Sequence, residues 1–363
     1  MAPVRSLQAF LEGVLASDGY AQRRATRESG EQSDGPFLNC WIAGHWERFA
    51  RRPGDVSPDG LAIVGSSGHL FIYGGTNDNV TAQRGEVQLP NSWIDEWQTL
   101  IAERTAAARN AGRHLVCIVV PGKIAVYADR FPLDLATNIP GRCCACLTRG
   151  GSHLFIRSTL QLARADGDTY LFTDSHLTLL GNLQLAVAAM TALGVSTTAD
   201  AGSGSREFVY AGDIGRHFNP PIVEIMWVAA TPSSARIVFD NSADLASVGA
   251  HVGTMRVFRN DHAADDRTVV VFGDSYSYRD DCYRGLSWFL AQAFREVHFV
   301  WVPFGWDPDY LDSVNADLVV CQTAERFVVR VPRARVDVRA MVDEMINQGV
   351  ALTSERIFSD RQL

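Results

Sequence analysis

The chain has 363 residues, of which 47% are hydrophobic and 20% are charged, a composition typical of a globular protein. The formal net charge is −8 and Lys and Arg are not clustered, which argues against a broad nucleic-acid-binding face. No apolar stretch of the sequence is long enough to span a bilayer, so we expect no membrane insertion.

The N-terminal segment predicts an amphipathic helix. Leu7, Phe10, Leu11 and Leu15 recur at helical spacing, with polar residues between them. A secretory signal needs an unbroken apolar region, which this pattern lacks. We therefore expect a helical lead-in over residues 1–55 and a cytoplasmic protein.

Four uninterrupted apolar runs predict strands that are buried on both faces, as in a parallel sheet. A helical pattern lies between the second run and the third, and strand, helix, strand in this order indicates a parallel sheet wound by helices. Further helices are expected from Ser92, over 178–193 and in the tail. The predicted fold is a three-layer α/β/α sandwich with a mostly parallel sheet over residues 56–334, followed by a C-terminal helical extension over 335–363. The four runs are 115–121, 268–273, 297–302 and 317–321.

Ser275 directly follows one predicted strand and precedes a predicted helix. Catalytic groups of open α/β sheets lie beyond the carboxyl ends of the strands. A serine at such a junction is exposed on a turn, and its N–H at a helix N-terminus can stabilise an oxyanion. On its own, however, the sequence Gly273-Asp274-Ser275 is more typical of a turn or a helix cap.

Asp174 and His176 form the one Asp-x-His pair of the sequence. The carboxylate can accept a hydrogen bond from the imidazole and fix its tautomer, which leaves the second ring nitrogen for a serine from elsewhere in the fold. The alternative is that Asp174 or Thr178 caps the next helix and that His176 is a solvated neighbour.

A third segment, Gly74–Asp78, follows a strand-like run. The side-chain amide of Asn77 is a suitable oxyanion donor, and Gly75 allows close approach of a substrate to the backbone. A simple turn, with Asp78 accepting from local N–H groups, explains these residues equally well.

Together the three segments resemble the signature blocks of the SGNH/GDSL hydrolase superfamily. The serine block comes last here and first in ordinary members, so the order looks circularly permuted. This order, and Asp-x-His in place of Asp-x-x-His, resemble the AlgX/AlgJ-like (alginate O-acetyltransferase-like) branch. Further similar segments lie at 119–132, 173–181, 212–215 and 315–327, and the resemblance covers roughly residues 60–327.

The resemblance implies that Ser275 is the nucleophile, His176 its base and Asp174 the residue that orients the base, with Asn77 and Gly75 at the oxyanion or substrate. It further implies O-acyl transfer, O-acetyl in particular, to a sugar or glycan-precursor hydroxyl in polysaccharide biosynthesis. The triad chemistry needs no cofactor, and the expected cytoplasmic location makes acetyl-CoA a candidate acyl donor. Members of the branch act outside the cytoplasm, however, and often have an aromatic residue where Leu177 stands. A carbohydrate esterase with the same triad and a non-catalytic glycan-binding protein on the same fold are the alternatives.

Two groups of residues could have a functional role, but the sequence argues against one in both cases. Cys143, Cys144 and Cys146 lack the second Cys or His pair that zinc sites use, so we predict no metal there. Five tryptophans could line a sugar platform, but most of them fall at helix-face or strand positions that favour core packing. They are Trp93, Trp97, Trp288, Trp301 and Trp306.

Overall fold

The structure is a computed structural model, and it describes residues 51–75, 79–84, 86–87, 89–135, 153–195, 205–229, 235–278 and 285–349. Nearly all of the predicted helical lead-in lies outside these ranges, as do Asn77 and the cluster of Cys143, Cys144 and Cys146. No helix among the described residues is long and apolar enough to cross a membrane.

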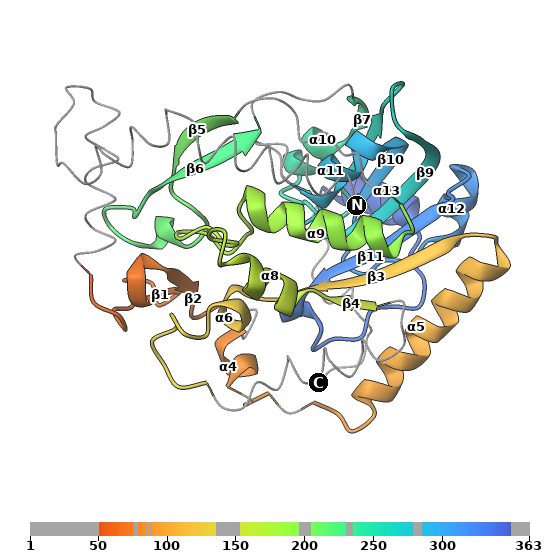
Figure 1. Ribbon diagram of the computed structural model, residues 1–363. Coiled ribbons are helices and arrows are strands. Elements are labelled where there is room, and N and C mark those ends of the chain that lie inside the picture. Colours follow the sequence, from red (N-terminus) through yellow and green to blue (C-terminus); the bar gives the residue numbers. More distant parts are fainter. Residues whose placement is uncertain are drawn as a thin grey trace.

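A seven-stranded sheet forms the centre of the molecule, in the order β4-β3-β11-β9-β10-β8-β7 (Figure 1). The first five strands are parallel to one another, and β8 and β7 extend the sheet in antiparallel fashion. The four predicted apolar runs are confirmed as β3, β9, β10 and β11. The bounds are β3 His114–Val120, β4 His153–Phe155, β7 Arg236–Asp240, β8 Met255–Arg259, β9 Asp265–Gly273, β10 Phe294–Trp301 and β11 Leu318–Ala324.

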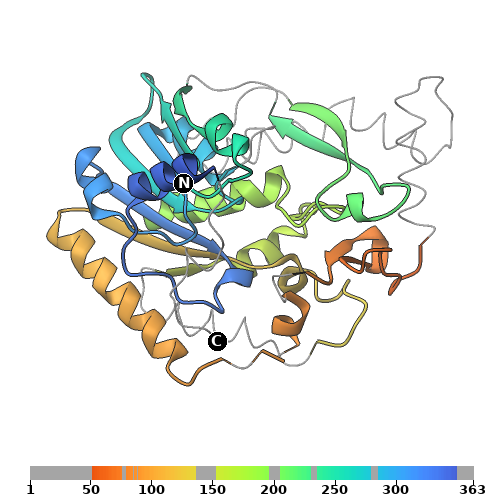
Figure 2. The ribbon, with the colours of Figure 1, turned by 180° about the vertical axis from the view of Figure 1, so that it is seen from behind.

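Helices cover both faces of the sheet. Successive strand residues point to opposite faces, and in these strands both sets are apolar, so each face has to be buried. In β9, Val269 and Val271 pack with one set of helices, and Val270 and Phe272 pack with the other. Figures 1 and 2 show the two outer layers from opposite sides, and the predicted α/β/α sandwich is confirmed. One layer contains α8 Arg157–Ala163, α9 Leu179–Ala192 and α11 Leu286–Ala293; the other contains α5 Trp93–Asn110, α12 Pro308–Ser313 and α13 Val338–Gln348.

Two antiparallel hairpins stand apart from the central sheet. One joins β1 Ala62–Val64 to β2 Leu70–Ile72 through the short helix η1 Ser66–Gly68. The other pairs β5 Ser205–Tyr210 with β6 Glu224–Ala229. The remaining short elements are α4 Asn79–Gln83, α6 Lys123–Val126, η3 Gly215–His217, α10 Ser242–Ser247 and η4 Glu325–Phe327.

The tryptophans mainly serve the core, as their spacing predicts. Trp93, Trp97, Trp288 and Trp306 are buried, and Trp301 is partly buried. The indole N–H groups of Trp93 and Trp97 both donate to the Val328 carbonyl, at 3.0 and 2.9 Å. These contacts fix α5 against the segment that follows β11.

We expect Trp97→Ala to lower the free energy of unfolding by about 3–5 kcal/mol, since it removes a fully buried ring and its hydrogen bond. Trp97 is 1% exposed and packs edge-on against Phe304, with the two ring centroids 5.0 Å apart. Urea unfolding followed by circular dichroism measures the change, with Leu162→Ala, at an exposed helix position, as the control. A loss below about 1 kcal/mol would contradict the packing described here.

Candidate active site

Ser275 lies on a tight turn just beyond the carboxyl end of β9. The Asp274 carbonyl accepts hydrogen bonds from the N–H groups of Ser277 and Tyr278, at 2.9 and 3.2 Å. The prediction that a helix follows directly is wrong, since α11 begins only at Leu286. The chain turns back at Gly285, where a Cβ would lie 2.3 Å from the Ser277 carbonyl oxygen. Ser275 therefore stands on a turn and not at a helix N-terminus.

Asp274 ties this turn to the neighbouring strand β11. Its buried carboxylate accepts from the Tyr276 N–H at 3.0 Å, from the Gln322 amide at 2.8 Å and from the Ala324 N–H at 2.7 Å. The Gln322 side-chain oxygen in turn accepts from the Asp274 N–H and the Ser277 hydroxyl. Gln322 is not predicted from the sequence, where its one signal is a polar residue inside an apolar strand.

A tight antiparallel loop presents Asp174 and His176. Tyr170 pairs with Leu177, and the Leu171 N–H donates to the His176 carbonyl at 3.1 Å. Thr178 caps α9 by accepting from the Gly181 N–H. Of the two cap candidates, Thr178 has that role, and the Asp174 side chain turns toward His176.

The structure brings Ser275, His176 and Asp174 into one hydrogen-bonded chain. Ser275 Oγ lies 2.8 Å from His176 Nε2, and His176 Nδ1 lies 2.6 Å from Asp174 Oδ1. These contacts are consistent with a tautomer in which Nδ1–H donates to Asp174 and Nε2 accepts from the serine hydroxyl. The Asp174 side chain is fully buried and the His176 side chain is 13% exposed. Ser275 is partly exposed.

Further hydrogen bonds fix the Asp174 carboxylate. Its Oδ1 also accepts from the His176 N–H at 2.8 Å, and its Oδ2 accepts from the Tyr210 hydroxyl at 2.7 Å and the Asp213 N–H at 3.1 Å. Only a glycine at position 212 lets the Asp213 backbone come this close to Asp174, because a Cβ at Gly212 would lie 2.2 Å from the Thr173 carbonyl oxygen. The segment 212–215 is among those that carry the sequence resemblance, although no role for Asp213 follows from it.

Two buried charged groups hold the base of this loop. The Lys123 ammonium donates to the carbonyls of Leu70, Phe172 and Asp174, at 2.7, 2.8 and 3.2 Å. Burial lowers the pKa of Lys123 to about 8. Glu224 accepts from the N–H groups of Phe172 and Thr173 and from the Thr173 hydroxyl, and burial raises its pKa. Neither residue is identifiable from sequence spacing, since both act through contacts distant in the chain.

The predicted oxyanion residues are described only in part. Gly75 follows β2 with a φ of 103°, and Asn77 lies outside the described residues. Because β2 belongs to a separate hairpin, this segment does not follow a strand of the central sheet. The roles of Gly75 and Asn77 therefore stay predictions. The Ser275 N–H is a second candidate, since no described residue accepts a hydrogen bond from it.

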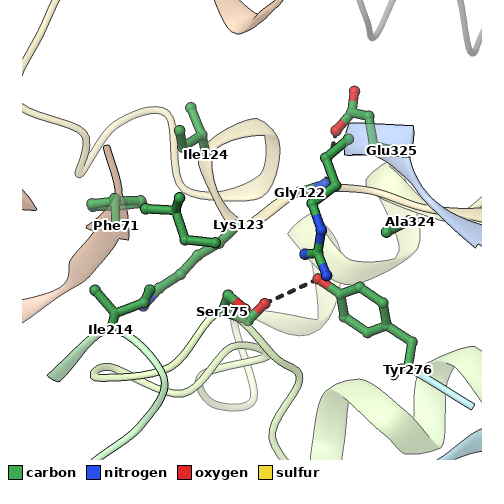
Figure 3. A pocket seen from close by; sticks show the side chains of 11 residues that line it. Phe71, Gly122, Lys123, Ile124, Ser175, Ile214, Tyr276, Ala324 and Glu325 are labelled. Carbon is green, nitrogen blue, oxygen red and sulfur yellow. Dashed lines mark hydrogen bonds between the residues drawn. The ribbon is translucent and has the colours of Figure 1, made fainter. Parts of the chain in front are cut away.

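A pocket lies at the carboxyl ends of β3 and β11, and residues adjacent in sequence to Ser275 and His176 line it (Figure 3). Ser175 and Tyr276, the sequence neighbours of His176 and Ser275, line one side, where the Tyr276 hydroxyl donates to the Ser175 carbonyl at 3.0 Å. Burial raises the pKa of Tyr276, which keeps this hydroxyl protonated. Apolar side chains line the opposite side, namely Phe71, Ile124 and Ile214.

Among the residues that the structure describes, Asp174, His176 and Asp213 form one group with ligand atoms within 4.8 Å of one another, close enough for a metal ion. Each Asp174 oxygen already accepts two hydrogen bonds, and the two Asp213 oxygens accept from Ser175. A cation would have to displace these donors, so the group fits a hydrogen-bonded base better than a metal site.

No family model and no curated protein matches this sequence. Among solved structures, the chain is similar to the O-acetyltransferase domain of Pseudomonas putida AlgJ, at 17% identity over 82% of this chain and 99% of that chain, with a TM-score of 0.48. It is also similar to Bacillus cereus PatB1, at 12% identity over 69% and 93% of the two chains, with a TM-score of 0.48. A DHHW family protein from Eubacterium siraeum has 15% identity over 82% and 100% of the chains, with a TM-score of 0.47.

Gly212→Ala is expected to displace the loop at Asp174 and to slow labelling of Ser275 by an organophosphate at least about 100-fold, because small misplacements of reacting groups are costly. Mass spectrometry of the labelled protein follows the rate. Gly249→Ala is the control, since a Cβ there meets nothing within 4 Å, although its φ of 70° carries a backbone cost. Labelling of Gly212→Ala at the wild-type rate would show that the close contact between Gly212 and the Thr173 carbonyl does not position the triad.

Proposed function

We propose that this chain is a serine-dependent O-acyltransferase of the SGNH type, which transfers an acyl group, in particular acetyl, to a hydroxyl of a sugar or glycan precursor. In this proposal Ser275 is the nucleophile, His176 the general base and Asp174 the residue that orients the base. The observation that carries it is the hydrogen-bonded chain of 2.8 and 2.6 Å through these three side chains. The AlgX/AlgJ-like order of the motifs supports acetyl transfer to a sugar.

In the acylation step, Ser275 Oγ attacks the carbonyl carbon of the donor while its proton passes to His176 Nε2. The Ser275 N–H is one donor to the oxyanion that forms. The bond to the leaving group then breaks, the leaving group takes the proton from Nε2, and an acyl ester remains on Ser275. Asp174 keeps the imidazole in the required tautomer and stabilises the imidazolium without becoming protonated.

In the second step, the acceptor hydroxyl gives its proton to His176 Nε2 as its oxygen attacks the acyl ester. Ser275 Oγ is the leaving group and takes the proton back, so the residues return to their starting state. Water in place of the sugar hydroxyl gives hydrolysis by the same steps. Transfer therefore depends on a bound acceptor in near-attack geometry and on exclusion of water.

The donor and the acceptor belong to the proposal as well. The resemblance implies a carbohydrate acceptor, acetyl-CoA is a candidate donor substrate, and the proposed steps use no cofactor. The pocket beside Ser175 and Tyr276 lies next to the reacting residues and is a candidate position for part of a substrate.

We expect acetylated sugar to exceed free acetate when the protein is given an acetyl donor with a panel of glycans and nucleotide sugars. Chromatography with mass detection partitions the product between the two. Dominance of free acetate across the panel, with efficient deacetylation of acetylated glycans, would establish the esterase alternative. If no donor or ester is consumed although the folded protein reacts with an organophosphate, the glycan-binding alternative holds.

In the same assay, Ser275→Ala and His176→Ala are expected to lower turnover by about 10³-fold or more with little change in melting temperature, and the double variant no further, because the two side chains act as a unit. Asp174→Asn is expected to be less severe. His217→Ala is the matched control, since His217 also bonds a carboxylate, Asp59 at 2.7 Å, but lies outside the proposed triad. Wild-type turnover in Ser275→Ala would rule out the covalent mechanism.

A further inference from the structure

Asp213 is a second carboxylate beside the imidazole of His176. Its Oδ2 lies 3.6 Å from His176 Nδ1, and its side chain is 28% exposed. Ser175 joins the two groups, since its hydroxyl donates to Asp213 Oδ2 at 2.5 Å and lies 3.5 Å from His176 Nδ1. The Ser175 N–H fixes the other oxygen of Asp213 at 2.7 Å. Asp213 is thus held at this distance by two hydrogen bonds from one residue.

The charge of Asp174 is shared among several donors. Its carboxylate accepts from His176 twice, from the Tyr210 hydroxyl and from the Asp213 N–H. The Lys123 ammonium lies 3.2 Å from the Asp174 carbonyl oxygen and interacts electrostatically with the carboxylates of both Asp174 and Asp213. Both effects weaken the stabilisation that Asp174 alone can give to a positively charged imidazole.

We propose that Asp213, held in place by Ser175, is a positioning residue whose carboxylate acts through space as the second negative charge that stabilises the His176 imidazolium. The inference rests on the proposed function, because the imidazolium forms when Ser275 Oγ gives its proton to Nε2. The proton on Nδ1 stays there, facing Asp174 Oδ1, and no proton passes to Asp213.

None of the other described groups around the imidazole carries a negative charge that would stabilise the imidazolium, apart from Asp174. Tyr276, whose ring centroid lies 5.3 Å from that of His176, donates its hydroxyl proton to Ser175 and is uncharged, because burial raises its pKa. Ser275 and Tyr210 are neutral hydroxyls, and Lys123 has the opposite sign. Among the described groups that the structure places against His176, Asp174 and Asp213 are therefore the two that favour its charged form.

The test is Asp213→Asn, a nearly isosteric change that removes the charge. An Asn oxygen can still accept from the Ser175 N–H, and its amide can donate to the Ser175 hydroxyl. We expect the acid limb of the kcat/KM profile for an activated acetyl ester to move to lower pH by about one unit, since a carboxylate at this distance favours the protonated ring. The plateau is expected to fall about three- to tenfold, because a less basic imidazole is a weaker general base, with KM nearly unchanged.

Three comparisons separate charge from structure. Ser175→Ala removes the hydroxyl link but keeps both carboxylates, so its acid limb is expected to stay within about half a unit of wild type. Asp213→Glu keeps the charge and is expected to retain the wild-type limb. Asp59→Asn removes the carboxylate of the remote Asp59–His217 pair and is the matched control. A lower plateau in Asp213→Asn with an unmoved acid limb would overturn the proposal and leave Asp213 a structural role.

An NMR titration of the His176 ring signals gives a readout that needs no substrate. The midpoint is expected at lower pH in Asp213→Asn than in wild type, by about one unit, and an unchanged midpoint contradicts the inference. If wild-type protein forms no acyl-Ser275, the proposed function fails, while the titration still decides whether Asp213 stabilises the charged ring.

Discussion

The hydrogen bond between Ser275 and His176 joins two segments that are 99 residues apart in the chain, and the proposed chemistry depends on it. Parallel strands make this contact feasible, because their carboxyl ends meet at one edge of the sheet. β9 delivers Ser275 there, and β11 fixes the serine turn through Gln322 and the Ala324 N–H. The loop with His176 leads directly into α9 and brings the imidazole to within 2.8 Å of Ser275 Oγ.

That loop depends on buried charges whose desolvation must be offset by hydrogen bonds. Lys123 is surrounded by three carbonyl oxygens, and Glu224 accepts three hydrogen bonds from Phe172 and Thr173. Removal of one such partner leaves an unpaired polar group in a low-dielectric interior. This lowers the free energy of unfolding more than removal of one partner of an exposed pair does. The same network that fixes Asp174 also sets the electrostatic surroundings of His176. Position and basicity of the base therefore have a common origin.

Local patterns in the sequence predicted much of the central fold. Apolar runs gave β3, β9, β10 and β11, and Thr178 with the helical spacing after it gave α9, because strand burial and helix capping depend on neighbouring residues. The edge strand β7 and its neighbour β8 were not placed in the sheet, since β7 is exposed throughout and has no buried run. The late start of α11 was missed because it depends on the contact of Gly285 with Ser277. Gln322, Asp213 and Lys123 act through partners distant in sequence, which no spacing rule detects.

Intact-mass spectrometry after incubation with an activated acetyl ester tests the central claim most directly. The account predicts one added acetyl group per chain in wild-type protein, mapped by peptide sequencing to Ser275 and absent from Ser275→Ala. The adduct should disappear when a productive acceptor is added, since the acceptor hydroxyl attacks the same ester. Turnover of the donor with no adduct on Ser275 under trapping conditions, or an adduct that persists in Ser275→Ala, would contradict the account.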